Sequence, residues 1–177
     1  MQIADKGGDL SGLSMPTVLA LSLQVEYRLI FNYPRVIDQI VGVHGMAGES
    51  DESVKTLKRL GLDSVQHAHW TAGLIRDLGR DPELDFEVFD TQTDIAAWLL
   101  ECREREKFAL SLYERAKSVA EQRQTRMKSW SLKGRLSALL SARAAVSKSG
   151  IEALDRLVAA EREHVQLMDK VISELKI

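Results

Sequence analysis

The chain contains the stretch EYRLIFNY, from Glu26 to Tyr33, and repeats its pattern as EKFALSLY from Glu106 to Tyr113. Each stretch has a glutamate, apolar residues three and four positions later, and a tyrosine seven positions later. Because residues at these spacings share one face of an α-helix, each stretch predicts a helix that carries its glutamate and tyrosine on the apolar face. The same spacing of apolar residues continues along most of the chain, so we expect an all-α fold.

Start and stop signals in the N-terminal half predict two helices. The first is expected over residues 14–41, with a kink or short break near Tyr33 because Pro34 follows it. The second is expected over residues 50–79, where Ser50 can cap the start and a glycine ends the helix.

Two further helices are predicted in the C-terminal half. The third begins at residue 91 or 93 and runs to about residue 121. The fourth runs over residues 149–175, because Ser149 and Glu152 have the spacing of a capping box. The connection over residues 79–90 is long enough, at about 3.3 Å per residue, to cover a bundle of about 30 Å. We therefore expect a four-helix bundle with one long crossover between the second and third helices.

Composition narrows the class of protein. With 177 residues, 45% hydrophobic and 28% charged, the chain fits one compact domain over residues 14–177, after a Gly-rich leader at 1–13 that we expect to be disordered. The net charge of -2 argues against a nucleic-acid partner. The single cysteine, Cys102, excludes disulfide frameworks and Cys-rich metal sites, and we expect a reducing, cytoplasmic location. No targeting or membrane-spanning segment is evident.

Five polar residues interrupt the apolar faces of the four expected helices near the middle of each helix: Glu26, His67, Glu106, Glu161 and His164. Buried carboxylates without compensation cost several kcal/mol or remain protonated, and a bound cation would supply that compensation. Carboxylate and imidazole ligands suit iron or manganese, and the three-residue spacing from Glu161 to His164 puts both on one side of their helix.

These motifs resemble those of the ferritin-like superfamily of di-iron carboxylate proteins, nearest the rubrerythrin-like group. The stretch QHAHWTAGLIRDLGRDP, residues 66–82, resembles the end of that group's second helix. The resemblance covers residue 14 to the end of the chain. It implies a ferritin-like bundle with Glu26 and Glu106 as terminal carboxylate ligands. It further implies that Glu161 bridges two metal ions and that His67 and His164 each bind one of them.

One position departs from the family pattern. The second helix of the family carries E-x-x-H, whereas here the motif reads Ser64-Val-Gln-His67, so one bridging carboxylate is missing. Asp63 is about 100° away around the helix and could replace it only if the helix rotates or bulges. The expected cofactor is therefore two iron ions, or one iron and one manganese, held by five ligands, with a single metal ion as the alternative.

The resemblance implies redox chemistry on dioxygen or peroxide. Peroxide reduction or iron oxidation is favoured over substrate hydroxylation, because no separate substrate pocket is evident. An external electron donor is expected, because the cysteines of a rubredoxin-type site are absent. We also expect a homo-oligomer, as a dimer.

A different class of function also fits the sequence. Residues 122–148 contain seven Lys or Arg and no acidic residue, and their leucines favour an extra basic helix between the third and fourth helices. This segment could cover the bundle or contact an acidic partner. The alternative function is therefore a helical interaction module with a degenerate or single-metal site.

Overall fold

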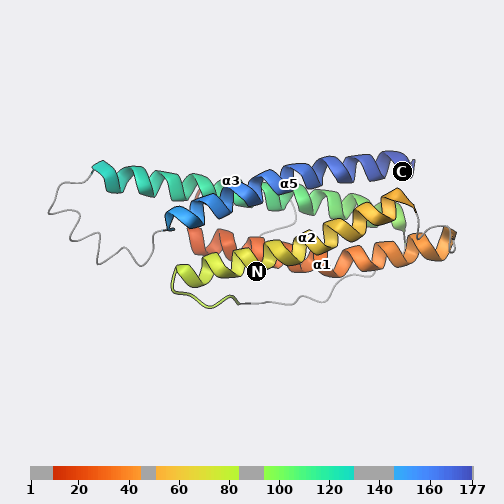
Figure 1. The fold of residues 1–177 in the computed structure, drawn as a ribbon, viewed down its shortest axis with the longest axis horizontal. Coiled ribbons are helices and arrows are strands. Elements are labelled where there is room, and N and C mark those ends of the chain that lie inside the picture. Colours follow the sequence, from red (N-terminus) through yellow and green to blue (C-terminus); the bar gives the residue numbers. More distant parts are fainter. Residues whose placement is uncertain (1–9, 45–50, 84–93, 130–145, 177) are drawn as a thin grey trace.

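The computed structural model of the chain describes residues 10–44, 51–83, 94–129 and 146–176. These residues form four helices: α1 (Met15–His44), α2 (Glu52–Asp77), α3 (Ile95–Ser129) and α5 (Lys148–Glu174). They contain no strand within the described ranges. The prediction of an all-α fold organised as a bundle of four helices is confirmed (Figure 1).

The four helices pack in a closed ring of neighbours. Helix α1 packs against α2 and α3, and α5 packs against α3 and α2. The ion pairs of Arg103 with Asp169 and of Lys117 with Asp155 connect α3 and α5 in opposite sequence order, which shows that these two helices are antiparallel. Every neighbouring pair is antiparallel, so α1 and α5 run in one direction while α2 and α3 run in the other (Figure 1).

The core is built from leucines that each helix contributes at helical spacing. Burying each of these side chains contributes roughly 1.5–3 kcal/mol of transfer free energy. The leucines that are 0–1% exposed are Leu19, Leu23, Leu29, Leu57, Leu60, Leu99, Leu112, Leu154 and Leu157. The binary pattern in the sequence therefore defines the inner faces of all four helices.

Helix α1 runs without a break through Pro34, so the short break expected near Tyr33 is absent. Pro34 lies on the exposed side of the helix, where water can solvate the carbonyl group that loses its donor. The predicted cap of α2 is wrong by one residue. The cap is Asp51, whose carboxylate accepts a hydrogen bond from the backbone N–H of Ser53 at 2.8 Å, in place of Ser50.

The predicted ends of α3 and the predicted start of α5 also need correction. Helix α3 begins at Ile95, where Asp94 accepts a backbone hydrogen bond, and it continues to Ser129, eight residues beyond the expected end. The expected capping box at the start of α5 does not form. Ser147 caps this helix instead, and its side chain accepts a hydrogen bond from the backbone N–H of Gly150 at 3.1 Å.

Parts of two predicted segments are described. In the predicted leader, Leu10 and Leu13 pack against the core, while residues 1–9 lie outside the described residues. In the basic segment, residues 122–129 continue α3, and the extra helix expected there falls mostly on residues 130–145, outside the described residues. No described helix has the length and apolar character needed to cross a membrane.

The cap of α5 gives a test of where this helix starts. Ser147→Ala removes the side chain that satisfies a free N–H group, so we expect the free energy of unfolding to fall by about 1 kcal/mol. Ser149→Ala serves as the matched control and should change it by less than about 0.5 kcal/mol. Urea unfolding measures both values, and a larger effect of Ser149→Ala would restore the capping box predicted from the sequence.

Candidate metal centre

The four helices bring all five predicted site residues together in the core. Glu26 comes from α1, His67 from α2, Glu106 from α3, and Glu161 and His164 from α5. The three glutamates are 0% exposed and the two histidines 1–2%. Ionisable residues are rarely buried to this extent unless they have partners, so the cluster needs a specific arrangement of charge.

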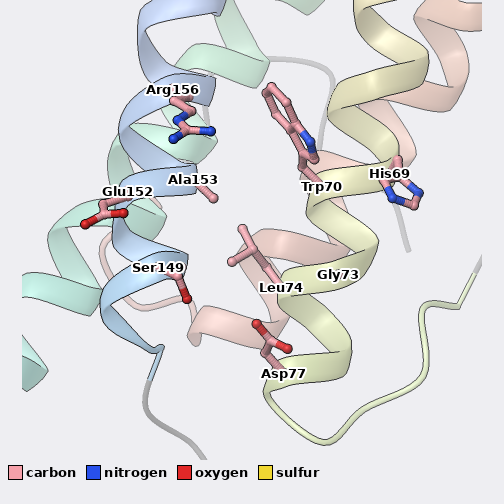
Figure 2. A pocket seen from close by; sticks show the side chains of 10 residues that line it. His69, Trp70, Gly73, Leu74, Asp77, Ser149, Glu152, Ala153 and Arg156 are labelled. Carbon is pink, nitrogen blue, oxygen red and sulfur yellow. The ribbon is translucent and has the colours of Figure 1, made fainter.

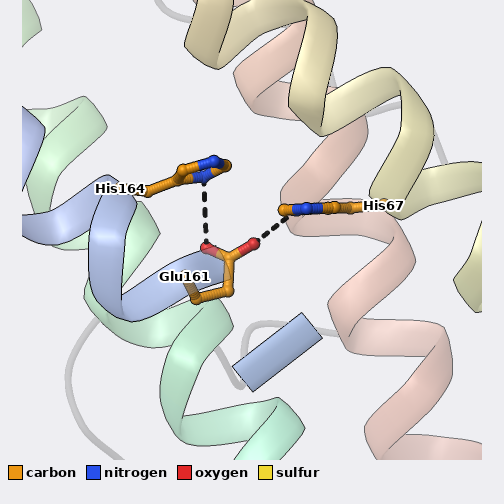
Figure 3. Close-up of side chains that lie close together, drawn as sticks. All are labelled: His67, Glu161 and His164. Carbon is orange, nitrogen blue, oxygen red and sulfur yellow. Dashed lines mark ion pairs between the residues drawn. The ribbon is translucent and has the colours of Figure 1, made fainter. Parts of the chain in front are cut away.

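The carboxylate of Glu161 faces both imidazoles (Figure 3). Its Oε1 atom is 2.6 Å from Nδ1 of His67, and its Oε2 atom is 3.8 Å from Nδ1 of His164. The two rings are stacked, with centroids 5.0 Å apart and planes 19° apart. Ligand atoms of these three buried residues lie within 4.8 Å of one another, which is close enough to hold a metal ion.

The other two glutamates each lie beside one of the two imidazoles. Oε1 of Glu26 is 3.7 Å from Nδ1 of His67, and Oε2 of Glu106 is 3.3 Å from Nδ1 of His164. We call Glu26 with His67 the first half-site and Glu106 with His164 the second half-site. Each half-site therefore offers one carboxylate and one imidazole, and Glu161 faces both.

The repeated glutamate-tyrosine motif forms a reciprocal pair of hydrogen bonds between α1 and α3. The hydroxyl of Tyr33 donates to Oε1 of Glu106, and the hydroxyl of Tyr113 donates to Oε1 of Glu26 at 2.8 Å. Thr71 is hydrogen-bonded to the hydroxyl of Tyr113 at 2.8 Å. Burial raises the pKa of both tyrosines well above its usual value, so they remain protonated donors that orient the two carboxylates.

Glu161 and Glu106 are both buried, but the pKa values of their carboxyl groups shift in opposite directions. Burial, and then the negative charges of Glu26 and Glu106, raise the pKa of Glu161 well above its usual value. Burial also opposes ionisation of Glu106, but its contacts with His164, Glu161 and Tyr33 outweigh burial and lower the pKa of Glu106. The ionised form of Glu161 therefore needs a neighbouring positive charge more than that of Glu106 does.

Asp63 contacts the outer side of the second half-site. Its Oδ2 atom is 3.4 Å from Nε2 of His164, the ring nitrogen that faces away from Glu106. Burial lowers the pKa of His164, but the hydrogen bond and charge of Glu106, and then the charge of Asp63, raise it above its usual value. Asp63 therefore orients an imidazole, and it does not occupy the bridging position that the sequence left open to it.

Ser64 occupies the inner face of α2 at the place expected for the missing carboxylate. It is 0% exposed, one turn before His67, and its Oγ atom has no hydrogen-bond partner among the described residues. A short side chain in this position leaves the cluster with three carboxylates in the core.

Several buried atoms of the cluster lack hydrogen-bond partners in the described part of the chain. They are both carboxylate oxygens of Glu161, Oε2 of Glu26 and Nδ1 of His67. The short distance between His67 and Glu161 is thus a close contact without hydrogen-bond alignment. Unpaired buried carboxylate oxygens that converge with an imidazole nitrogen are a donor set that fits a divalent transition metal.

A groove of about 320 Å³ lies beside the cluster, between α2 and the N-terminal part of α5 (Figure 2). Trp70 lines this groove, and its indole is stacked on His67 with ring centroids 5.9 Å apart. Trp70 therefore connects the buried imidazole with the protein surface. Cys102 by contrast is 0% exposed in the core, and burial raises the pKa of its thiol.

Sequence reasoning missed the roles of three residues. The sequence places Tyr33 and Tyr113 on the apolar faces of their helices, and the structure adds that each hydroxyl donates a hydrogen bond to a site carboxylate. The signal was present, because the same glutamate-tyrosine spacing on two antiparallel helices forms reciprocal pairs. Thr71 gave no signal, because its role depends on a hydrogen bond that crosses the core from α2 to α3.

Comparisons with family models, with curated proteins and with solved structures find no significant match to this chain. The resemblance to ferritin-like proteins therefore stays a prediction from the sequence motifs alone.

Replacing Glu161 tests whether its buried carboxylate destabilises the metal-free protein and whether a bound metal ion removes that cost. A raised pKa in the folded state means that Glu161 costs no stability below its unfolded pKa and destabilises the protein as pH rises through its folded pKa. Glu161→Gln should therefore raise the Tm of metal-free protein at neutral pH by about 2–8 °C, the shift that 1–2 kcal/mol produces. The difference should vanish at about pH 3, where glutamate is neutral in both states.

In the metal-loaded protein the order should reverse, because Glu161→Gln removes the central ligand. Scanning calorimetry with and without metal measures both effects. Glu152→Gln, an exposed glutamate on the same helix, is the control and should change neither Tm. Metal-induced stabilisation of equal size in wild type and Glu161→Gln would show that Glu161 binds no metal.

Position 64 gives a second test of the site. Ser64→Glu returns a carboxylate to the inner face of α2, and we expect it to reduce metal loss to a chelator by about tenfold or more, the range that even indirect partners of a ligand produce. Gln66→Glu adds the same charge at an exposed position of the same helix and is the matched control. Equal metal loss from both variants and wild type would show that residue 64 does not face the metal.

Proposed function

We propose that this chain is a ferritin-like metalloprotein that binds two non-haem iron ions, or one iron and one manganese, and uses them for redox chemistry on dioxygen or peroxide. The observation that carries the proposal is the position of Glu161, whose two oxygens face two different imidazoles, each with its own second glutamate. This arrangement matches two ions that share one carboxylate.

The directions of the helices support the same proposal. The sequential helices α2 and α3 are parallel and lie diagonally opposite, so the end of α2 and the start of α3 lie at opposite ends of the bundle. This is the connectivity of ferritin-like bundles, whereas an up-down-up-down bundle makes sequential helices antiparallel neighbours.

Peroxide reduction is the reaction that this proposal favours. It breaks the O–O bond and consumes two electrons and two protons to give two waters. Iron held by Glu26, His67, Glu106, Glu161 and His164 would supply the two electrons, and an external electron-donor protein would restore them. Tyr33 and Tyr113 hold Glu106 and Glu26 in fixed orientations through their hydroxyl donors. Trp70 offers a contact between His67 and the surface groove, where a donor can approach.

A single-ion site is the second candidate, because the buried Ser64 leaves one ligand position without a carboxylate. His67, Glu161 and His164 alone then hold one ion. The helical interaction module inferred from the basic segment remains a prediction, since residues 130–145 lie outside the described part of the chain.

Metal stoichiometry tests the proposal directly. Protein produced with iron should contain about two metal ions per chain by elemental analysis, as in di-iron bundles. About one ion per chain would favour the single-ion site, and less than about half an ion would contradict metal binding. The loaded protein should consume hydrogen peroxide when a reduced donor is supplied, and Glu106→Gln should slow this reaction about tenfold or more.

A further inference from the structure

We propose that the two half-sites bind metal with unequal affinity, and that Asp63 makes the second half-site, Glu106 with His164, the tighter one. This inference rests on the proposed function, because it assigns an order of loading to the same cluster. It comes from comparing the two half-sites atom by atom, since they are related by an approximate two-fold axis.

The two-fold relation follows from three pairs of matching contacts. Tyr33 donates to Glu106 as Tyr113 donates to Glu26. Each of these glutamates lies within 4 Å of Nδ1 of one histidine, His164 and His67 respectively. Glu161 faces both histidines from the centre. A residue of α2 therefore corresponds to the residue of α5 that lies the same number of sequence positions from its own histidine, His67 on α2 and His164 on α5.

The correspondence fails at the residue four positions before each histidine. On α2 this residue is Asp63, whose carboxylate is 3.4 Å from Nε2 of His164. Arg59 holds this carboxylate from the other side, at 3.5 Å. On α5 the corresponding residue is Ala160, which has no polar side-chain atom. Only the second half-site thus has a described carboxylate on the outer nitrogen of its imidazole.

A carboxylate on the outer nitrogen matters because it fixes which ring nitrogen carries the proton. With the proton on Nε2, the Nδ1 atom of His164 presents a lone pair toward Glu106 and Glu161, and the ring becomes a stronger donor. Loss of such a partner typically lowers metal affinity by about 10–100-fold. The two half-sites should differ by a factor in this range.

A second asymmetry acts in the opposite direction and is smaller. Thr71 is hydrogen-bonded to Tyr113, which orients Glu26 in the first half-site, whereas Met168 occupies the corresponding position on α5. This contact is a neutral hydrogen bond that reaches the ligand only through another hydroxyl. Asp63, by contrast, brings a full charge directly beside a ligand imidazole, 3.4 Å from Nε2 of His164, so this contact decides the order.

Titration of metal-free protein with Co²⁺, followed by its visible absorption and by calorimetry, tests this inference without any turnover. Wild type should bind two ions in separate steps whose dissociation constants differ by about 10–100-fold. Asp63→Ala should weaken the tighter step by a similar factor and leave the weaker step unchanged. Asp77→Ala, an exposed position on the same helix, should alter neither step.

Ala160→Asp should do the converse and tighten the weaker step, because it provides the missing carboxylate beside His67. Ala159→Asp adds the same charge at the adjacent, exposed position and is its matched control. Glu26→Gln should remove the weaker step and Glu106→Gln the tighter one, which assigns the steps to the half-sites.

The outcomes separate this inference from the proposed function. Two steps of equal affinity, or equal weakening of both steps by Asp63→Ala, would overturn the inference while leaving two-metal binding intact. Binding of no cobalt at all would overturn the proposed function as well. The Asp63→Ala result decides the matter even if Ala160→Asp fails to fold.

Discussion

The fold of this protein depends on how three carboxylates are accommodated in one apolar core. Glu26, Glu106 and Glu161 are fully buried, and an isolated ionised carboxylate in such a place would be expelled or neutralised. The bundle responds with two imidazoles and two tyrosine hydroxyls, which orient two of the carboxylates. The central one, Glu161, has no hydrogen-bond partner for either oxygen among the described residues. The core is thus organised around a carboxylate whose ionised form its described neighbours do not compensate, and the residues of this cluster come from all four helices.

The antiparallel contact of α1 and α3 turns a local sequence motif into a long-range constraint. Seven residues separate the glutamate from the tyrosine in each helix, and the two helices run in opposite directions. The tyrosine of each helix therefore lies level with the glutamate of the other. This reciprocal pairing fixes the register of the two helices more specifically than leucine packing does, because a shift by one turn would leave two buried carboxylates without donors.

The sequence predicted the helices and the five clustered residues because apolar spacing and the histidine-glutamate motifs are local signals. Helix boundaries were less predictable. The caps at Asp51 and Ser147 each lie within two residues of the predicted serines, which is the usual error in placing a helix end from sequence. The position of Asp63 could not be derived from an ideal helix, because an angle of 100° around α2 does not reveal that α5 brings His164 to its carboxylate. Such contacts between helices depend on their packing, which a single sequence does not encode locally.

The approximate two-fold axis has a consequence for how this site can vary. In a symmetric assembly of two identical helical hairpins, every substitution would appear twice, and the two metal positions would remain equivalent. Here both hairpins belong to one chain, so each position can change alone. Under the two-fold relation Ser64 corresponds to Glu161, Asp63 to Ala160, and Thr71 to Met168. Because the two hairpins are parts of one chain, a single substitution can alter one metal position while the other metal position keeps its ligands.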